Sequence, residues 1–371
     1  MTRPKFLNVT DALDNRRRRG RARGPARGVL LITSGGLGDV VMFALVLPRF
    51  LKLAEPDEPV TVLLRRDAAK MAFLFEADTA IETVDYGRLL KERAYRREIG
   101  DRLYAANYRL VVTTDYLRHP LLDESLVRAC AAEAVSMLAR PWPKHDAMLA
   151  KNQELYARQF DSGIARRDKI VRWNDFADWL LGENAPPPRV RLDGQKLAPP
   201  ADLDRPLVLI QPYSAVTAKQ SPAGLYRRLI AALPADWDVR LTGSPADLDS
   251  DPDLARLTES RNVDFDTSTF SELVRLMRAA RLVVSVDTAA MHLAVAVGAP
   301  TLCLASAAYV DEIVPYAPEI TPENVRFLYT PMECAGCLGD CRLPFEDGMY
   351  PCVARLDADA VIAAALEMAN P

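Results

Sequence analysis

One stretch of residues suited to chemistry is SGGLGD at 34–39, directly after a short apolar run at 29–33. Glycines let a backbone approach a ligand closely, and a carboxylate on a loop beside a ligand can act as a general base. The spacing G-G-x-G differs from the dinucleotide fingerprint G-x-G-x-x-G, and an acidic residue at a helix start repels phosphate. Asp39 also suits a second role, because aspartate is favoured as a cap at a helix start. Both roles of Asp39 stay open at this point.

Two further stretches combine charge with loop positions. SVDTAAMH at 285–292 lies between a β-branched run and a helix of small residues, where Asp287 or Thr288 would cap the helix. The free amides of such a helix start suit a phosphate. His292 is one of three histidines and fits either a ligand contact or an ordinary hydrogen bond inside a helix. YSAVTAK at 213–219 ends in Lys219, which fits either the neutralisation of a diphosphate or a solvated surface.

These stretches follow strands in an alternating series of strands and helices. The pattern predicts strands at 29–33, 60–64, 81–84 and 110–114, and again at 207–211, 239–242, 282–285 and 301–304. Longer helical patterns occur between them, including 121–132, 145–160 and 173–181 in the first series. Strands alternating with helices indicate a parallel sheet covered on both faces. The sequence therefore predicts an α/β fold of two doubly wound, Rossmann-like domains that face a cleft, with ligands at the carboxyl ends of the strands.

A change in composition separates the two series. Six prolines between residues 185 and 206 exclude both a helix and a central strand there. We expect a flexible basic tail at 1–28, an N-terminal Rossmann-like domain at 29–192, a linker at 193–206, a second Rossmann-like domain at 207–352 and a C-terminal helix at 353–371.

Composition excludes several classes of protein. Apolar residues make up 49% and charged residues 26% of the 371 residues, which is ordinary for a soluble globular protein. The longest apolar run has 8 residues, at 40–47, whereas a membrane-spanning helix needs about 20. Glycines interrupt the apolar stretch after the basic tail and no small-residue cleavage site follows it, so we expect no secretion signal and a cytoplasmic location.

Charge is concentrated at the N-terminus. Residues 1–28 carry a net charge of +7, which leaves −10 for the rest of a chain whose total is −3. The tail suits either a solvated, solubilising segment or attraction to the anionic inner leaflet of a membrane, at about 1 kcal/mol per basic residue near the surface. The acidic remainder offers no basic stripe, so we expect no nucleic acid partner.

Four stretches of the chain resemble glycosyltransferase family 9, the ADP-heptose:lipopolysaccharide heptosyltransferases. They are VLLITSGGLGDVV, LIQPYSAVTAK, LTGSPAD and SVDTAAMHLAVAVGAP, in the order and at the spacing of the family from Val29 onward. The resemblance implies a GT-B fold with an acceptor-side N-terminal domain and a nucleotide-sugar-binding C-terminal domain. It further implies inverting, metal-independent transfer of a sugar, most simply heptose from ADP-heptose, to a lipopolysaccharide-core or related cell-envelope acceptor. The nucleotide sugar is then a substrate, and no cofactor is expected.

The resemblance assigns roles to individual residues. Asp39 would be the base that deprotonates the acceptor hydroxyl, on a loop supported by Gly36 and Gly38. The expected donor-binding residues are Ser214, Lys219, Asp247 (beside Gly243), Asp287, Thr288, Met291 and His292. Departure of a nucleoside diphosphate needs positive charge and oriented amides, which Lys219 and the helix start at Thr288 could supply.

The chain also departs from the family's pattern. Ala289 replaces a glycine, Gln211 replaces a histidine, and the Trp-Pro pair after the loop lysine is absent. The acceptor side has no residue matched by motif, and the basic candidates there are Arg65, Arg66 and Arg118.

Four of the six cysteines are close together in sequence, as Cys334-x2-Cys337-x3-Cys341-x10-Cys352. A cytoplasmic location argues against disulfides, and a C-x2-C pair with two further cysteines is compatible with a metal. We expect free thiols and keep a metal site as the alternative. A similar cysteine-rich stretch near the C-terminus is common in the family that the chain resembles.

Three functions compete. The first is a heptosyltransferase-like enzyme, with a transferase that uses a different nucleotide sugar as its variant. The second is a UDP-N-acetylglucosamine 2-epimerase, which shares the GT-B architecture but needs several carboxylates and histidines in a chain that has three histidines. The third is a non-catalytic module that binds a nucleotide sugar or a partner, which the replacement at Ala289 keeps open.

Overall fold

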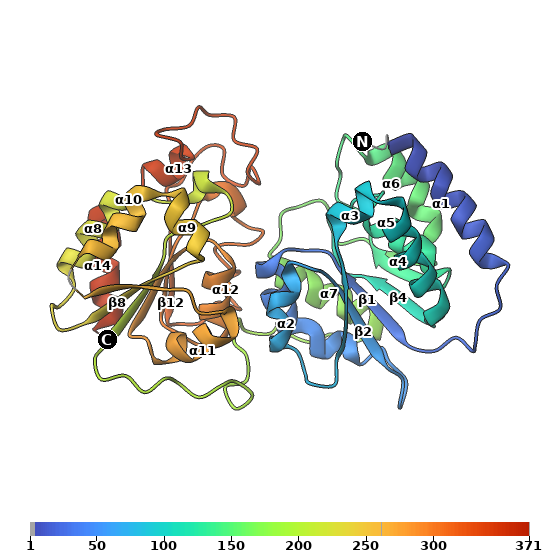
Figure 1. Ribbon diagram of the computed structural model, residues 1–371, viewed down its shortest axis with the longest axis horizontal. Coiled ribbons are helices and arrows are strands. Elements are labelled where there is room, and N and C mark those ends of the chain that lie inside the picture. Colours follow the sequence, from blue (N-terminus) through green and yellow to red (C-terminus); the bar gives the residue numbers. More distant parts are fainter. Residues whose placement is uncertain (1–3, 261, 371) are drawn as a thin grey trace. The chain divides into compact units, whose positions relative to one another are not determined.

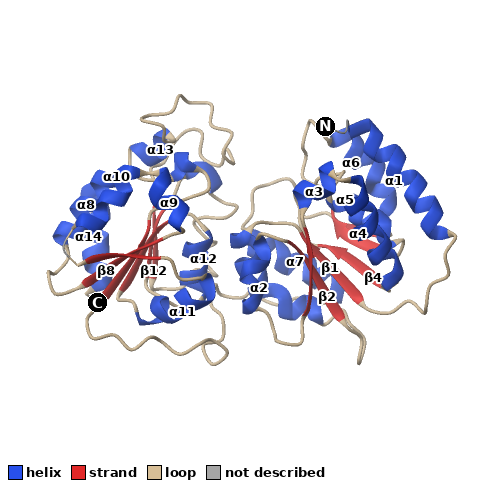
Figure 2. Ribbon diagram, in the orientation of Figure 1, coloured by secondary structure: helices blue, strands red, loops and turns tan. Residues whose placement is uncertain are grey.

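A computed structural model describes residues 4–260 and 262–370 and divides into two compact units. Unit 1 comprises Met1–Ala165 and Arg172–Pro186, and unit 2 comprises Arg166–Val171 and Pro187–Pro371. Each unit consists of one parallel sheet between layers of helices (Figure 2).

The division lies earlier in the chain than the expected linker at 193–206. Backbone hydrogen bonds tie the residues just before and within that segment to unit 2: Val190 N donates to Ile320 O at 2.9 Å, Leu192 N to Ala296 O at 2.7 Å and Ala201 N to Arg275 O at 2.9 Å. Proline removes only its own N–H, so the residues between the prolines still pair with neighbouring backbone. The segment is therefore part of the second unit.

Unit 1 has a six-stranded sheet in the order β3-β2-β1-β4-β5-β6, with all neighbours parallel. The central strands β1 (Val29–Thr33) and β4 (Leu110–Thr113) are buried along their whole length, as a sheet covered on both faces requires. The remaining strands are β2 (Val60–Arg65), β3 (Ala80–Val84), β5 (Glu133–Met137) and β6 (Arg158–Phe160).

Helices cover both faces of this sheet (Figure 1). On one face, α3 (Tyr86–Lys91), α4 (Arg93–Ala106) and α5 (Asp123–Cys130) pack their apolar sides on alternate residues of the central strands. On the other face lie α2 (Leu37–Leu51) and α7 (Lys169–Leu181), joined by ring contacts of Phe43 with Trp173 and of Phe50 with Phe176. The helix expected at 145–160 is shorter in the structure. Helix α6 spans Asp146–Asn152, and after a short turn the chain becomes extended at Tyr156 and enters edge strand β6.

Unit 2 has a second six-stranded parallel sheet, in the order β12-β11-β10-β7-β8-β9. Its central strands β7 (Leu207–Gln211) and β10 (Leu282–Val286) are again apolar and buried, except for the last residue of β7. The other strands are β8 (Asp238–Thr242), β9 (Val263–Asp266), β11 (Thr301–Leu304) and β12 (Val325–Leu328).

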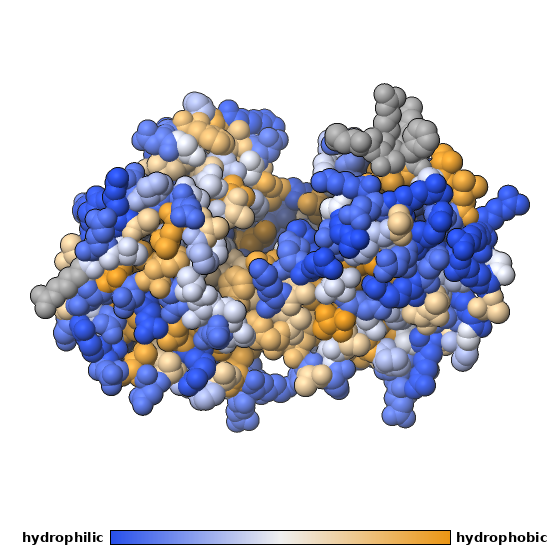
Figure 3. Space-filling view, in the orientation of Figure 1, coloured by the Kyte–Doolittle hydropathy of each residue, from blue (hydrophilic) through white to orange (hydrophobic). Residues whose placement is uncertain are grey.

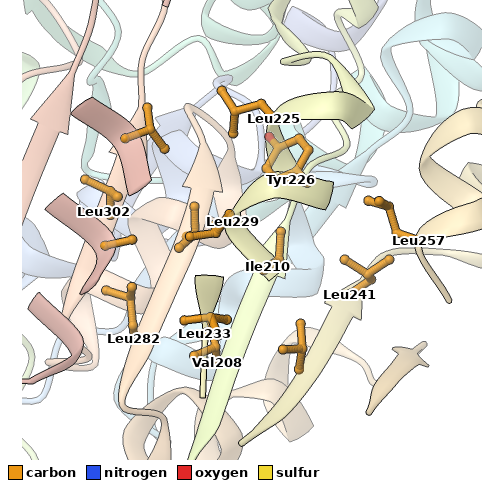
Figure 4. Close-up of a cluster of buried hydrophobic side chains, with 14 of the residues drawn as sticks. Val208, Ile210, Leu225, Tyr226, Leu229, Leu233, Leu241, Leu257, Leu282 and Leu302 are labelled. Atoms are coloured by element: carbon orange, nitrogen blue, oxygen red, sulfur yellow. The ribbon is translucent and has the colours of Figure 1, made fainter. Parts of the chain in front are cut away.

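One face of the second sheet is covered by α8 (Ala223–Ala232) and α14 (Ala358–Ala369). Figure 4 shows Leu225, Tyr226 and Leu229 of α8 in one cluster with Val208 and Ile210 of β7. The helix expected at 353–371 thus runs from Ala358 to Ala369 and belongs to this core. The other helices are α9 (Pro245–Ser250), α10 (Pro252–Ala255), α11 (Phe270–Ala279), α12 (Ala289–Ala296) and α13 (Pro351–Ala354).

The two sheets share one topology. Numbered from the first strand of each unit, both follow the order 3-2-1-4-5-6 of doubly wound folds, so the predicted pair of doubly wound sheets is confirmed. Strand order reverses between β1 and β4 in unit 1 and between β7 and β10 in unit 2. Each of these places, here called a switch point, is where ligands bind in such folds.

The N-terminal segment differs from the flexible tail expected at 1–28. Residues Pro4–Arg19 form helix α1, which packs against α4. Ion pairs join Asp11 to Arg96 at 2.6 Å and Arg18 to Asp101 at 2.8 Å. Acidic and basic residues thus match across the two helices, a complementarity that net charge alone does not reveal. Among the residues that the structure describes, no helix has the length and apolar character needed to span a membrane.

Hydrogen bonds to the Glu58 carboxylate link the amino ends of the two central strands of unit 1. Its carboxylate accepts hydrogen bonds from Gly28 N, just before β1, and from Arg109 Nε, just before β4, both at 2.8 Å. The hydrogen bonds from Arg109 contribute most to lowering the pKa of the Glu58 carboxyl from 4.5 to about 2. A carboxyl whose pKa falls on folding stabilises the fold above its unfolded pKa.

We predict that Glu58→Gln lowers the free energy of unfolding by about 2 kcal/mol at neutral pH, after allowance for the partly exposed guanidinium. The deficit relative to the wild type shrinks as pH falls from 4.5 towards 2, because the wild-type carboxyl becomes protonated there. Urea unfolding across this pH range measures it. Glu55→Gln, at an exposed carboxylate 3.7 Å from Arg109, is the matched control and should have no such pH-dependent deficit.

Candidate active site

Asp39 lies in the first turn of α2, at the switch point of unit 1. Its Oδ2 accepts a hydrogen bond from Gly36 N at 2.6 Å, which is the capping role allowed by the sequence. Gly36 is the cap residue itself, and Gly38 lies in the first turn. Gly35 is required sterically, because a Cβ there would meet the Asp39 Cβ at 2.3 Å. The capping bond fixes the carboxylate at the end of β1, where a general base would stand.

A second acid at the same switch point was missed from the sequence. Asp115, two residues after β4 and 3% exposed, accepts hydrogen bonds on Oδ2 from Ser34 N at 2.6 Å and Ser34 Oγ at 3.0 Å. The signal was present in the run Thr113-Thr114-Asp115, where polar residues directly follow a buried strand. In a parallel sheet that position shares an edge with the loop after β1.

Asp123 is a second buried acid in this region, besides Asp115. The carboxylate accepts hydrogen bonds from Tyr86 Oη and from His119 N, both at 2.6 Å. Burial, with a smaller contribution from the negative charge of Asp115, raises the pKa of the Asp123 carboxyl to about 6. Burial and Asp123 likewise raise the pKa of Tyr86.

The three basic candidates on this unit are all engaged in ion pairs. Arg118 is 1% exposed, pairs with Glu124 and donates to Met137 O at 2.7 Å, so its role is structural. Arg65 pairs with Asp67 at 2.6 Å and Arg66 with Asp85 at 3.7 Å, both near the surface.

Lys219 lies at the switch point of unit 2, at the end of the short helix Thr217–Lys219. The residue is 9% exposed. Its Nζ donates to the backbone oxygen of Asp287 at 2.7 Å and forms an ion pair with Asp287 Oδ1 at 3.1 Å. The ammonium also lies 4.8 Å from the centre of the Tyr309 ring. The structure therefore rules out the solvated surface lysine and brings two predicted donor-site residues together.

Asp287 is the anionic partner in this arrangement and directly follows β10. Ser306 Oγ donates to its Oδ2 at 3.0 Å. Burial raises the pKa of the Asp287 carboxyl, and the positive charge of Lys219 opposes that rise. The buried pair is thus held together by charge and by hydrogen bonds.

Two more donor-site candidates lie on neighbouring loops of unit 2. Ser214 N donates to Gln220 Oε1 at 2.9 Å, and Ser214 Oγ accepts from Val216 N. Asp247 makes the same kind of capping bond as Asp39. It lies in the first turn of α9 and accepts a hydrogen bond from Ser244 N at 2.6 Å. Gly243 is needed between them because a Cβ would lie 2.9 Å from Tyr213.

An open hollow of about 430 Å³ lies beside these loops, at the carboxyl ends of β8 and β9. Its lining includes Arg240, Phe265, Asp266 and Ser268. Phe265 and Asp247 both flank Gly243, so the hollow adjoins Asp247, one of the expected donor-binding residues.

The remaining candidates, Thr288, Met291 and His292, differ in burial: the first lies at the start of α12 and the other two lie inside the core. Thr288 is the cap residue of α12 and is partly exposed, so the first amides of the helix lie at the switch point. Met291 and His292 are buried further along the helix, where His292 Nδ1 is hydrogen-bonded to Tyr316 Oη. The structure thus makes His292 a buried helix residue with an ordinary hydrogen bond, to Tyr316 outside the helix, as the sequence allowed.

The cysteine-rich segment packs against the loop that carries Lys219. Tyr350 N donates to Ala218 O at 2.9 Å, and Ala307 N donates to Cys352 Sγ at 3.4 Å. All six thiols are free, and burial is the main cause of the raised pKa of Cys352. Over residues 4–260 and 262–370, no three or more His, Cys, Asp or Glu side chains are arranged to hold a metal.

Comparison with known proteins identifies the family. Residues 155–333 match the model of Glycosyltransferase family 9 (heptosyltransferase). The chain carries a glycosyltransferase family 9 domain. The predicted family and the predicted class of enzyme, a glycosyltransferase, are confirmed. The matched residues include every predicted donor-site residue. No curated protein matches the chain significantly.

Solved structures of family 9 enzymes share the fold. Escherichia coli heptosyltransferase WaaC with ADP-2-deoxy-2-fluoro heptose is 18% identical, with a TM-score of 0.67, and the match covers 93% of this chain and 99% of that one. A family 9 glycosyl transferase from Veillonella parvula DSM 2008 is 15% identical (TM-score 0.66, coverage 92% and 97%). E. coli ADP-heptose lps heptosyltransferase II is 14% identical (TM-score 0.64, coverage 92% and 98%). At these identities the likeness establishes the GT-B fold.

We predict that Lys219→Met lowers the free energy of unfolding by about 3 kcal/mol at pH 7, because the buried Asp287 carboxylate loses its cation. The loss becomes smaller as pH falls, since protonation of Asp287 removes the unpaired charge. Denaturant unfolding measures the effect. The double variant Lys219→Met/Asp287→Asn should recover part of the loss; equal losses in the single and double variants would contradict the pairing.

Proposed function

We propose that this protein transfers heptose from ADP-heptose to a hydroxyl of a lipopolysaccharide-core or related cell-envelope glycan, with inversion at the anomeric carbon and without a metal. The observation that carries the proposal is the buried Lys219–Asp287 pair at the switch point of a family 9 domain. A nucleotide-sugar donor is further supported by WaaC, which is described with an ADP-heptose analogue.

Asp39 is the proposed general base. Its carboxylate takes the proton of the acceptor hydroxyl as that oxygen forms a bond to the anomeric carbon of the donor. The bond from that carbon to the diphosphate breaks at the same time, and ADP leaves with the electron pair. One carboxylate oxygen is held by Gly36 N, so the base enters the reaction already oriented.

Unit 2 supplies the proposed donor site. Lys219 Nζ has three N–H donors, one of which bonds to the backbone oxygen of Asp287. The ammonium and the first amides of α12 then stabilise the negative charge that develops on the leaving diphosphate. Because these groups provide positive charge, we expect transfer to proceed in the presence of a metal chelator.

The nucleoside end of the donor is proposed to lie along the next loops. Asp247 would accept hydrogen bonds from ribose hydroxyls, with Ser214 on the neighbouring loop nearer the phosphates. The hollow at Phe265 and Ser268 is large enough for a purine base. Met291 and His292 would contribute indirectly, by packing α12 against the core and so holding its first amides in place.

Contact with an anionic membrane is also part of this proposal, and α1 is the surface that supports it. Val9 and Leu13, 60% and 59% exposed, lie four residues apart on the same side of the helix as exposed Arg16 and Arg17. Figure 3 shows apolar side chains on the outer side of this helix beside hydrophilic ones. An apolar stripe with arginines suits the interface of an anionic bilayer. A cytoplasmic location at the inner face of the membrane would follow.

We predict that Asp39→Asn lowers kcat by at least a hundredfold, the range for loss of a general base, and leaves the Kd for ADP within twofold. Asparagine keeps an oxygen that can accept from Gly36 N, so the fold should be retained. Asp247→Asn, the matched change at the other capping acid, should instead weaken ADP binding. Transfer assays with ADP-heptose and calorimetric titration measure both effects.

The same titration discriminates the alternatives. Selective binding of ADP over UDP and GDP supports the proposed donor, whereas preference for UDP or GDP would replace the donor and keep the enzyme class. Unchanged turnover in Asp39→Asn would overturn the proposed base. Binding of nucleotides without transfer to any glycan acceptor would favour the non-catalytic module.

We predict that the wild-type protein co-sediments with vesicles containing phosphatidylglycerol and not with vesicles of phosphatidylcholine alone. Arg16→Gln/Arg17→Gln should weaken that binding about thirtyfold, since two basic residues at about 1 kcal/mol each near an anionic surface are removed. Arg227→Gln/Arg281→Gln, at two exposed arginines of unit 2, is the matched control. Equal binding by both double variants would exclude α1 as the contact.

A further inference from the structure

The loop that carries Asp39 begins at Ser34, which bonds to a buried carboxylate. This residue is the first after β1, and both its N–H and its hydroxyl donate to Oδ2 of Asp115, at 2.6 and 3.0 Å. Between Ser34 and the capping bond of Asp39 lie Gly35 and Gly36, whose backbones have no side chain to restrain them. Where Ser34 is held therefore sets the start of the loop that leads to Asp39.

Asp115 is itself held rigidly. The pairing of β1 with β4 continues past the strand ends, because Thr114 N donates to Ile32 O at 3.0 Å and the Thr33 and Thr114 hydroxyls are 2.9 Å apart. Trp173 Nε1 donates to Thr114 O at 2.8 Å from the opposite layer. These contacts make the residue before Asp115 part of the sheet.

Burial of a carboxylate at 3% exposure is costly unless hydrogen bonds compensate for lost hydration. Here Ser34 provides two of those bonds, so the carboxylate favours a single position of Ser34. The corresponding place in unit 2 uses the same arrangement: Asp287, after the fourth strand, holds Lys219 of the loop after the first strand. In both units an aspartate at the switch point restrains a loop that carries a candidate functional group.

We propose that Asp115 is a positioning residue, which fixes the loop 34–39 through Ser34 and so holds the Asp39 carboxylate in place for proton abstraction. This inference rests on the proposed role of Asp39. Asp115 acts as a hydrogen-bond acceptor and takes no proton from the substrate.

The test compares Asp115→Ala, which removes the acceptor, with Asp115→Asn, which keeps an acceptor oxygen. We expect Asp115→Ala to lower kcat at least tenfold and to leave the Kd for ADP within twofold, since the donor residues belong to unit 2. Asp115→Asn should retain kcat within threefold of the wild type. Amide hydrogen exchange over residues 34–39 should be faster in Asp115→Ala than in the other two proteins.

A matched control separates positioning from general stability. Glu124→Gln changes another buried acid of unit 1, which is bonded to Asn152 and Arg118 and makes no hydrogen bond to the loop. It should lower the melting temperature without changing kcat or exchange at 34–39. Ser34→Ala should lower kcat less than Asp115→Ala, because the Ser34 N–H can still donate, and adding it to Asp115→Ala should cause no further loss.

Two results would overturn the proposal. One is unchanged exchange at 34–39 together with unchanged kcat in Asp115→Ala. The other is an Asp115→Asn variant as impaired as Asp115→Ala with loop exchange like the wild type, which would mean that the charge matters and the anchor does not. If the wild-type protein transfers no heptose, the proposed function fails, and hydrogen exchange still decides whether Asp115 anchors the loop.

Discussion

In both units, a buried aspartate after the fourth strand of a parallel sheet holds the loop after the first strand. Asp115 holds Ser34, and Asp287 holds Lys219. The sheet order 3-2-1-4-5-6 makes this contact possible, because it places the first and fourth strands side by side with their carboxyl ends at one edge. A buried carboxylate without bonds is costly, so each contact favours a single loop position. The two contacts thus restrain the loop that leads to Asp39 and the loop that carries Lys219.

The two switch points differ in charge, and the difference matches different chemistry. In unit 1 the aspartate holds a neutral serine, and Asp39 and Asp123 add further acids in the same region. That environment suits a group that accepts a proton and disfavours a phosphate. In unit 2 the aspartate holds a lysine, and the amides at the start of α12 add partial positive charge. That environment suits a diphosphate. The same topology thus carries an acidic switch point in unit 1 and one with added positive charge in unit 2.

For Asp39 and Asp247, a capping bond at the start of a helix is compatible with the role proposed for each carboxylate. Asp39 and Asp247 each accept a bond from the cap residue of their helix, on one oxygen of the carboxylate. A cap is a common reason for aspartate at a helix start, and the same bond orients the carboxylate at the carboxyl edge of the sheet. His292 shows the opposite case, since its burial and its bond to Tyr316 account for it within the core.

The sequence by itself determined the alternation of buried strands with helices, the two doubly wound sheets, the family, and the candidates Asp39, Lys219 and Asp287, because these depend on local periodicity and motif spacing. It did not determine the path of the proline-rich segment, which pairs with backbone of unit 2, or the helix α1, whose acids match arginines of α4. It also did not single out Asp115. The polar run 113–115 after a strand is a weak signal, and only the pairing of β1 with β4, which brings Ser34 and Asp115 together from 81 residues apart, gives Asp115 its partner. Long-range strand pairing decides which side chains meet, and it is formed by tertiary structure alone.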